Sequence, residues 1–371
     1  AESLEGNFLA AYIAGASRDT AAAAVFYREA LREDPANVEL LERAFVSFLA
    51  DGDFDSAARA AERISQRDPG NGLAQLTLGV KAFRARQFST ARTIFSRSGR
   101  GRAADLAATL MGAWSYAGAR DGKRALEVIN TIRGDRGFAV FRDYHAGLIA
   151  DLVGNLPEAE KRLQSAYEAD KNTLRIVDAY ARLLSRRGKS AEAKAAYAAY
   201  DALAPRNPMV RFGLAELDAG RTLPPLIQSA QDGAAEVLYG LGSAGSQQGD
   251  ELASLIYLRF ATLLDPEHSL ALVTMADVFE RMKQTDAAIA ALRRVPASSP
   301  LKTSAEVQIG LSLEQLGRGD EAIKHFETLK ADRPDDTDVL TALANVLRSR
   351  KKYTEAAAAY TDVLRRMPEG E

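Results

Sequence analysis

Residues 240–245, with the sequence GLGSAG, match the G-x-G-x-x-G pattern of a loop that binds a dinucleotide. Such a loop needs a strand before it and a turn that opens a helix, because the phosphates sit at the helix N-terminus. Here the glycines lie inside an expected helix, and Gly242 falls in a column of small residues described below. The pattern therefore predicts helix packing, and we expect no nucleotide or other cofactor.

Asp51, Asp53 and Asp55, followed by Glu62, imitate the ligand spacing of an EF-hand calcium loop. The glycine that this loop requires at its centre is Ser56 in this chain. The same residues fit a turn between two expected helices, and a calcium loop could not form there as well. We expect no calcium here and no metal elsewhere in the chain.

Histidine, serine and cysteine offer no catalytic arrangement. His145, His268 and His325 share no expected helix with a second histidine or with a carboxylate at metal-ligand spacing, so we expect each at the surface or in a groove. Ser299 and Lys302 match S-x-x-K only across a helix-ending proline, and the chain has no cysteine. Because no acid, base, nucleophile and anion site converge, we predict that the chain is not an enzyme.

The composition narrows the class of partner. The 48 Lys and Arg residues and the 50 Asp and Glu residues leave a formal net charge of -2, which gives no field that would attract nucleic acid or an anionic membrane. No segment approaches the roughly 18 apolar residues of a membrane-spanning helix. The chain begins at Ala1 without a methionine, so we expect a processed or trimmed product from which any export signal has been removed.

Small residues recur at a constant interval along the chain. At 371 residues the chain is longer than one hydrophobic core usually supports, and shifting the sequence against itself by 34 residues aligns two columns. Two columns of small residues indicate two close helix crossings in each repeat. The first column holds Ala23, Ala57, Ala91, Ala125, Ala159, Ala193, Ser254, Ala288, Ala322 and Ala356. The second, twelve residues earlier, includes Gly79, Ala113, Gly147, Ala181, Gly242, Ala276, Gly310 and Ala344.

Large residues stand four positions after the first column and fill the space that the small residues leave. Prolines nine positions further on end the second helix, because proline lacks the donor that a helix interior needs. Glycine-containing turns such as Gly52-Asp53 separate the two helices of a repeat. The large column includes Tyr27, Phe95, Ile129, Leu163, Tyr197, Leu258, Leu292, Phe326 and Tyr360.

With these columns and turns, the sequence resembles the tetratricopeptide repeat family, whose helix-turn-helix unit has 34 residues. The resemblance implies an all-α fold, an α-solenoid of tandem repeats that form a right-handed superhelix. Residues 1–207 match six repeats and residues 235–371 match four. Residues 208–234 fit a shortened, degenerate repeat, which is either a deletion absorbed by the stack or a bend between two arms.

The last repeat ends without the polar capping helix that a repeat array needs. We therefore expect the protein to be truncated at its carboxy-terminal end. Further repeats, another protein surface or self-association would cover the apolar face left there.

In the family that the sequence resembles, the first helix of each repeat lines an inner groove, and the resemblance carries that role to the matching positions here. In the first five repeats these positions are apolar. They are Phe8, Tyr12, Val46, Leu49, Leu76, Val80, Phe83, Leu110, Trp114, Phe141, Tyr144 and Leu148. Exposed apolar patches mark partner sites, so we predict a protein or peptide partner in this groove. The alternative is that superhelical winding buries these side chains as extra core.

From the sixth repeat onward the same positions are polar and predict a secondary polar groove. They include Arg175, Asp178, Arg182, Asp277, Asn345 and Arg348. Chaperone-binding relatives clamp carboxy-terminal Glu-Glu-Val-Asp tails with a set of Lys, Asn and Lys or Arg, which has no complete counterpart here. Binding of cytosolic chaperone tails is therefore disfavoured.

Two stretches resemble a narrower group of large bacterial tetratricopeptide proteins. They are residues 40–45 (LLERAF) with 50–54 (ADGDF), and residues 233–241 (GAAEVLYGL) with 255–259 (LIYLR). Those relatives are typically exported to the periplasm or outer membrane of Gram-negative bacteria. Some are similar to lipoprotein adaptors that recruit substrates to carboxy-terminal processing proteases. The resemblance implies a periplasmic or outer-membrane-associated scaffold that binds a protease, its substrate or a cell-wall factor.

Two other hypotheses remain open from the sequence. The first is a cytoplasmic assembly or chaperone-like module, and the second is the regulatory fragment of a larger enzyme. An apolar signal segment upstream of Ala1 would separate the envelope scaffold from the cytoplasmic module. A longer reading frame with a domain outside the repeats would support the enzyme fragment.

Overall fold

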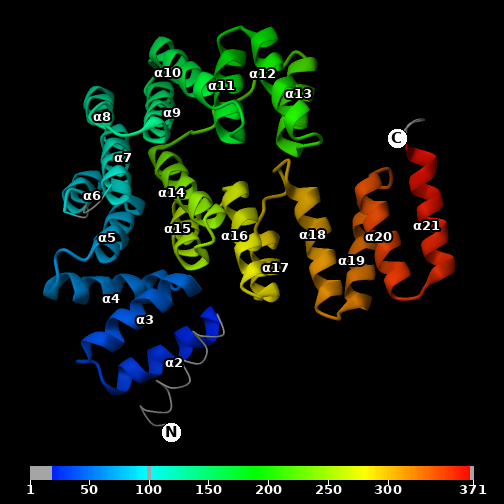
Figure 1. Ribbon diagram of the computed structural model, residues 1–371, viewed down its shortest axis with the longest axis horizontal. Helices are drawn as coiled ribbons and strands as arrows, with labels where there is room; N and C mark the ends of the chain where they lie inside the picture. The colour runs from blue at the N-terminus through cyan, green and yellow to red at the C-terminus, as the bar shows by residue number, and fades with distance from the viewer. Residues whose placement is uncertain (1–18, 98–101, 368–371) are drawn as a thin grey trace. The chain divides into compact units, whose positions relative to one another are not determined.

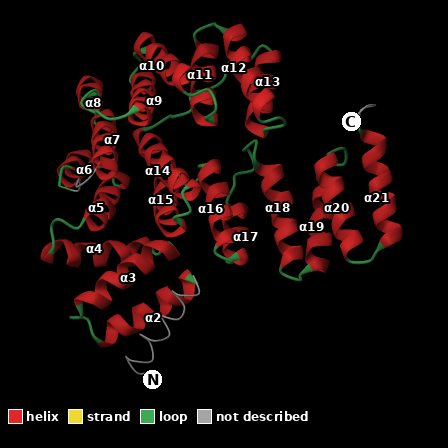
Figure 2. Ribbon diagram, viewed as in Figure 1, coloured by secondary structure: helices red, strands yellow, loops and turns green. Residues whose placement is uncertain are grey.

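The computed structural model describes residues 19–97 and 102–367 of the chain. Helices joined by turns and loops make up these residues, and no strand occurs among them (Figure 2). Consecutive helices pack against one another in pairs (Figure 1). The predicted fold class, an all-α solenoid of paired helices, is confirmed.

The chain divides into two compact units, Ala1–His268 and Ser269–Glu371. We refer to them as unit 1 and unit 2 and describe each by itself. The predicted division around residues 208–234 is a different one, and it stays a prediction.

Unit 1 contains the first fourteen described helices. They are α2 (Thr20–Glu33), α3 (Val38–Asp51), α4 (Phe54–Arg67), α5 (Gly72–Arg84), α6 (Phe88–Phe95), α7 (Arg102–Gly118), α8 (Gly122–Ile129), α9 (Arg136–Leu152), α10 (Leu156–Ala169), α11 (Leu174–Arg186), α12 (Ser190–Leu203), α13 (Pro208–Asp218), α14 (Ala230–Gln247) and α15 (Glu251–Leu264).

Unit 2 contains three further pairs. They are α16 (Ser269–Arg281) with α17 (Thr285–Arg293), α18 (Lys302–Gln315) with α19 (Gly319–Asp332), and α20 (Thr337–Ser349) with α21 (Tyr353–Arg366).

The turn between α3 and α4 shows why the helices begin and end where they do. Gly52 ends α3 with φ of +85°, a left-handed conformation that glycine adopts without a steric penalty. Asp53 then caps α4, because its Oδ1 accepts the Ser56 N–H at 3.1 Å. This confirms the expected inter-helix turn at the residues that imitate a calcium loop.

The small and large columns meet as the sequence predicts. A Cβ atom built on Gly79 would lie 2.3 Å from the Phe95 ring, and one on Gly310 would lie 2.3 Å from the Phe326 ring. On Gly147 it would lie 2.5 Å from Leu163. Since real carbon atoms do not approach so closely, glycine makes room for the large residue of the second helix in these three pairs, and alanine takes the same column in others. The repeat is therefore fixed by complementary shapes sixteen residues apart.

The segment after α13 carries the chain away from regular stacking. Residues 219–229 have no helix, and they bury Leu223 and Ile227. The Leu223 N–H donates to Ser185 Oγ at 3.0 Å, and Arg182 Nη1 donates to the Pro224 carbonyl at 3.1 Å. Ser185 and Arg182 both lie on α11, so the segment runs across α11 and leads into α14.

Helices α14 and α15 lie inside the arc that the earlier pairs of unit 1 form (Figure 1). Helix α14 packs against α7 and α9, whereas α15 packs against α3 and α5. All four are the first helices of their pairs, and the family resemblance gives those helices to the inner face. The inner groove of unit 1 is therefore occupied by the chain itself.

Candidate functional site, the groove that holds α14

Two glycines on one face of α14 receive two aromatic side chains of the groove. A Cβ atom on Gly233 would lie 2.2 Å from the Trp114 ring of α7, and one on Gly240 would lie 2.6 Å from the Phe141 ring of α9. Seven residues make about two helical turns, so both glycines face the same side of α14. The two aromatic side chains of the groove therefore pack against the two glycines of α14, which have no side chain in the way.

Helix α15 makes the corresponding contacts with α3 and with the first residue of α4. Arg259 Nε donates to the Ala50 carbonyl at 3.1 Å, across 209 residues of sequence. Phe260 meets Phe54 edge to face, with ring centroids 6.3 Å apart. These contacts join one end of the arc to the helix pair in its interior.

A buried carboxylate lies at the centre of the α14 contact. Glu236 Oε1 accepts the Tyr144 hydroxyl at 2.7 Å and Arg175 Nε at 2.8 Å. Glu236 Oε2 accepts Arg175 Nη2 at 2.7 Å and lies 2.9 Å from His268 Nε2. The exposed fraction of the Glu236 side chain is 1%. We refer to these four residues as the Glu236 cluster.

The charges of the Glu236 cluster fix its protonation state. Burial alone would raise the pKa of the Glu236 carboxyl, but the Arg175 guanidinium and the hydrogen bonds from Arg175 and His268 hold that pKa well below its usual range. Burial and the neighbouring carboxylate raise the pKa of Tyr144 well above its usual value. Glu236 is therefore ionised and Tyr144 neutral at neutral pH, so the cluster is an ion pair with two additional donors.

The only tryptophan of the chain is tied to a buried histidine beside this cluster. Trp114 Nε1 donates to His145 Nδ1 at 3.1 Å, and both side chains are fully buried. Because Nδ1 accepts, the neutral imidazole carries its proton on Nε2, which has no hydrogen-bond partner among the described residues. Burial lowers the pKa of His145 to about 4, although the charge of Glu236 opposes the shift.

The histidines are less exposed than the sequence suggested. His145 and His268 are buried, at 0% and 6% exposure, and only His325 is partly open. The expectation was a surface or groove position. The surface is wrong for the first two, which are buried at the groove that holds α14, where His145 packs under aromatic side chains and His268 binds Glu236. The described residues contain no group of three or more His, Cys, Asp and Glu side chains that could hold a metal ion.

Polar residues of α11 also form hydrogen bonds and ion pairs within unit 1. Asp178 Oδ1 accepts the Tyr197 hydroxyl at 2.6 Å and Arg182 Nε at 2.8 Å. Arg182 also binds the crossing segment, and Arg175 binds Glu236. The unit 1 half of the predicted secondary polar groove is therefore paired within the chain.

The predicted apolar groove is mostly core in this structure. The expectation of exposure is wrong for the buried members, and the alternative of burial by winding describes them, since α14 and α15 cover the first helices on which they lie. The binding role of the set stays a prediction. Val46 and Phe141 are half-buried, and Phe8 and Tyr12 lie outside the described residues. The buried members are Leu49, Leu76, Val80, Phe83, Leu110, Trp114, Tyr144 and Leu148.

In unit 2 the predicted members of the polar groove are exposed, and their binding role stays a prediction. Asp277, Asn345 and Arg348 are exposed on α16 and α20. Asn345 Oδ1 accepts the Tyr360 hydroxyl at 2.5 Å. These residues present polar and charged groups at the positions that the family resemblance assigns to partner contact.

Sequence reasoning missed Glu236, His268 and Arg259 as members of the site. One signal could have identified Glu236: it is a single charge within the apolar run of residues 233–241, between two glycines seven residues apart. A charged side chain that is surrounded by apolar residues on a helix needs a partner when the helix is buried. The signal does not name that partner, because Arg175 lies 61 residues earlier in the chain.

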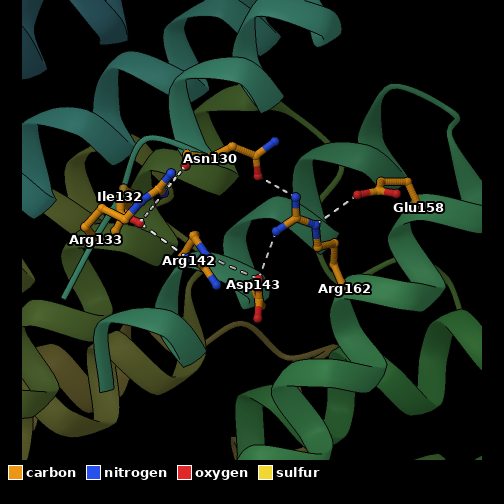
Figure 3. A network of polar contacts seen from close by, with 7 residues as sticks. All are labelled: Asn130, Ile132, Arg133, Arg142, Asp143, Glu158 and Arg162. Carbon is orange, nitrogen blue, oxygen red and sulfur yellow. Dashed lines mark hydrogen bonds and ion pairs between the residues drawn. The ribbon is translucent and has the colours of Figure 1, made fainter. Parts of the chain in front are cut away.

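A second polar network supports α9 from the outside of the site (Figure 3). Arg162 of α10 donates to Glu158 Oε1 and to Asp143 Oδ1, each at 2.9 Å, and also to Asn130. Arg142 donates to Asp143 at 3.3 Å and to a carbonyl of the loop after α8 at 3.3 Å. The network ties α9 to α10 and to this loop, so it orients the helix that carries Tyr144 into the groove.

The arrangement binds a helix, α14, and its charged groups are paired with one another. Glu236, Tyr144 and Arg175 are bound to one another, and Glu236 and Tyr144 are buried. No described helix is both long and apolar enough to span a membrane.

Comparisons with known proteins give the family of the chain. Sequence models of the tetratricopeptide repeat match residues 48–113, 270–301 and 307–371. No curated protein matches the chain.

Several solved structures are similar to parts of the chain. MamA is 18% identical, with 49% of this chain and 91% of that chain covered and a TM-score of 0.32. MamA from Desulfovibrio magneticus RS-1, from residue 41 to its end, is 19% identical, with 53% and 95% covered and a TM-score of 0.31. A chain of the Naa15/Naa10 complex bound to HypK-THB is 15% identical, with 94% and 61% covered and a TM-score of 0.35.

The repeat matches lie in both units, and each covers helices whose pairing and columns have the 34-residue interval. Helix pairs, glycine notches and sequence matches therefore agree, and the chain belongs to the tetratricopeptide repeat family.

Proposed function

We propose that this chain is a non-enzymatic adaptor that holds a protein partner by a helical or extended segment on its inner faces. As a tetratricopeptide repeat protein it is a protein–protein interaction scaffold. We propose further that the chain binds partners and catalyses no reaction. In support, the Glu236 carboxylate is buried and paired with Arg175, so it is not available to a substrate.

One observation carries the proposal: the inner face of unit 1 already binds a helix. Trp114 and Phe141 pack on glycines of α14, and Arg175 and Tyr144 bind its carboxylate. Aromatic and arginine anchors around a buried contact are the usual features of a protein-binding hot spot. The face is therefore chemically suited to hold a protein segment.

We also propose the cell envelope as its location and a carboxy-terminal processing protease, its substrate or a cell-wall factor as its partner. The support is the resemblance of residues 40–45 and 233–241 to exported bacterial repeat proteins. The accessible surface for that partner is the inner face of unit 2, where Asp277, Asn345 and Arg348 are exposed.

Affinity capture tests this function. The tagged chain would be incubated separately with envelope and cytoplasmic extracts of its source cells, and the bound proteins identified by mass spectrometry. We expect specific partners from the envelope extract. An arginine hot spot typically contributes 2 kcal/mol or more, so Arg348→Glu should lower partner recovery by roughly ten-fold or more. Arg365→Glu, the same charge change on α21, is the matched control.

The outcomes separate the hypotheses. Partners found only in the cytoplasmic extract would favour the assembly module over the envelope adaptor. Equal recovery by wild type and by Arg348→Glu would remove the unit 2 face from the proposal. Recovery of nothing above an untagged control in either extract would contradict the adaptor function.

A further inference from the structure

We propose that the groove of unit 1 is a selective helix-binding site, that α14 is its ligand within the chain, and that it accepts from a partner protein a helix of the same pattern. The pattern is a small residue, a glutamate three positions later and a second small residue four positions after that. This inference rests on the proposed function and names the class of partner segment that the groove fits.

The pattern follows from the spacing of the contact residues on α14. Gly233, Glu236 and Gly240 stand at relative positions 0, 3 and 7, which lie on one face of a helix. Opposite them, the groove supplies Trp114 for the first position and Phe141 for the last. Three contacts on a single helical face define both the position and the direction of the ligand helix.

The positions of Gly233 and Gly240 are selective for small residues, because the aromatic side chains that pack against them cannot move aside easily. Trp114 is fully buried, and its indole N–H is fixed by the hydrogen bond to His145. A Cβ on Gly233 would meet three atoms of that ring within 2.4 Å, so even alanine forces a displacement. A ligand helix with a bulky residue at this position could not reach the floor of the groove.

The glutamate position is selective because the groove holds a buried charge that needs a counter-charge. Arg175 makes a two-pronged contact with both Glu236 oxygens, at 2.8 and 2.7 Å, and Tyr144 adds a hydroxyl donor at 2.7 Å. Glutamine offers one acceptor oxygen and no charge. A helix with glutamine there leaves the guanidinium unpaired, a costly state in a buried site.

The walls of the groove are built without α14. Helices α7 to α11 pack consecutively, each against the next, and glycine notches such as Gly147 on Leu163 lock the pairs. In repeat proteins such neighbour contacts supply the stability of each unit. The non-helical residues 219–229 connect α14 to α13 as a tether. The receptor surface and its ligand are thus separate elements joined by a connecting segment.

The test uses the full chain and a labelled peptide of residues 229–247, which contains α14 and its Ser229 cap. In the chain variant Glu236→Gln, the internal helix lacks the charge that Arg175 requires, whereas the peptide still carries it. Fluorescence anisotropy measures binding of the peptide, and circular dichroism checks that the variant keeps its helix content.

We expect the peptide to bind the Glu236→Gln chain saturably and to show no binding to the wild-type chain, whose groove is filled. Two control peptides test the pattern: Glu236→Gln and Gly233→Leu should each bind the variant chain at least ten-fold more weakly. Gly233→Leu in the chain gives a second, steric way to open the groove. In that variant Trp114 emission should shift to longer wavelength, and the native peptide should bind.

Several results would overturn the inference. Binding of the Glu236→Gln peptide as tight as that of the native peptide would deny the role of the carboxylate. Absence of peptide binding by a folded Gly233→Leu chain with an exposed Trp114 would deny a receptor groove. Loss of helix content in both chain variants would show that α14 belongs to the folding core of the repeats.

Oligomeric state is measured in the same samples by light scattering. Dimers of the opened variants that dissociate when peptide is added would support the groove as the site, with α14 of a second copy as the occupant. Dimers that resist the peptide would contradict it. None of these readouts depends on the capture experiment, whose charge reversal lies in unit 2, so failure of this inference can be distinguished from failure of the proposed function.

Discussion

Acid should loosen the interior of unit 1 through one buried imidazole, that of His145. The ring lies under Trp114, Phe141 and Tyr144, and its Nδ1 accepts the indole N–H. Protonation would place a hydrogen on Nδ1 opposite that donor, which breaks the bond, and would bury a charge. The favourable field of Glu236 does not compensate, since burial lowers the pKa of His145 to about 4.

The magnitude follows from the difference in pKa between the folded and unfolded states. The folded pKa of His145 is about 4 and the usual value is 6.5, so between these values the unfolded chain binds the proton and the folded chain does not. Stability is therefore complete above the unfolded pKa and is lost as the pH falls from 6.5 towards 4. Between pH 7 and pH 5 the loss should be about 2 kcal/mol, because each pKa unit is worth about 1.4 kcal/mol.

The assay is urea unfolding followed by the fluorescence of the single tryptophan, Trp114, which reports on the site itself. His145→Asn is the matched variant, because its amide oxygen can take the place of Nδ1 as the acceptor and does not titrate. The wild type should lose about 2 kcal/mol more than the variant between pH 7 and pH 5. Equal losses in the two proteins would refute the reasoning.

Three substitutions test other parts of the fold by the same unfolding measurement or by circular dichroism. Arg175→Met leaves Glu236 buried without its counter-charge and should cost about 3–5 kcal/mol, whereas Arg175→Met combined with Glu236→Leu should restore much of that loss. Gly310→Val forces a side chain into the Phe326 ring and should destabilise unit 2 by about 1–3 kcal/mol, with partial recovery when Phe326→Ala is added. Asp53→Ala removes the cap of α4 and should cost about 1 kcal/mol, while Asp53→Asn should cost much less.

The helix pairs could be predicted from the sequence because their determinants are local. Gly79 and Phe95 lie sixteen residues apart, as do Gly310 and Phe326. Such a pair of a small and a large residue recurs every 34 residues, so several repeats indicate the same helix crossing. The glycines of residues 240–245 were predicted to pack within a helix, and α14 confirms this, since Gly242 lies against Leu258.

The filled groove could not be predicted, because its determinants are distant and occur once. The position of α14 depends on residues 219–229, which cross α11 through hydrogen bonds to Ser185 and Arg182. These bonds join residues that lie 38 and 42 positions apart in the sequence. The apolar residues of the groove were visible in the sequence. Their pattern does not depend on whether a partner protein or a later helix of the chain covers them, so it could not show which of the two does.

The Glu236 cluster explains how an apolar groove can be selective. Aromatic walls alone would accept many amphipathic helices, since hydrophobic contact has no direction. The ion pair makes the groove selective for a helix with a carboxylate at the position of Glu236. Any other helix would leave the largely buried Arg175 charge without a partner. A buried ion pair adds little to stability compared with a well-packed apolar contact. In this groove the effect of the ion pair is to reject helices that lack the glutamate. Helix α14 carries that glutamate between the two glycines that pack against the aromatic rings of the groove.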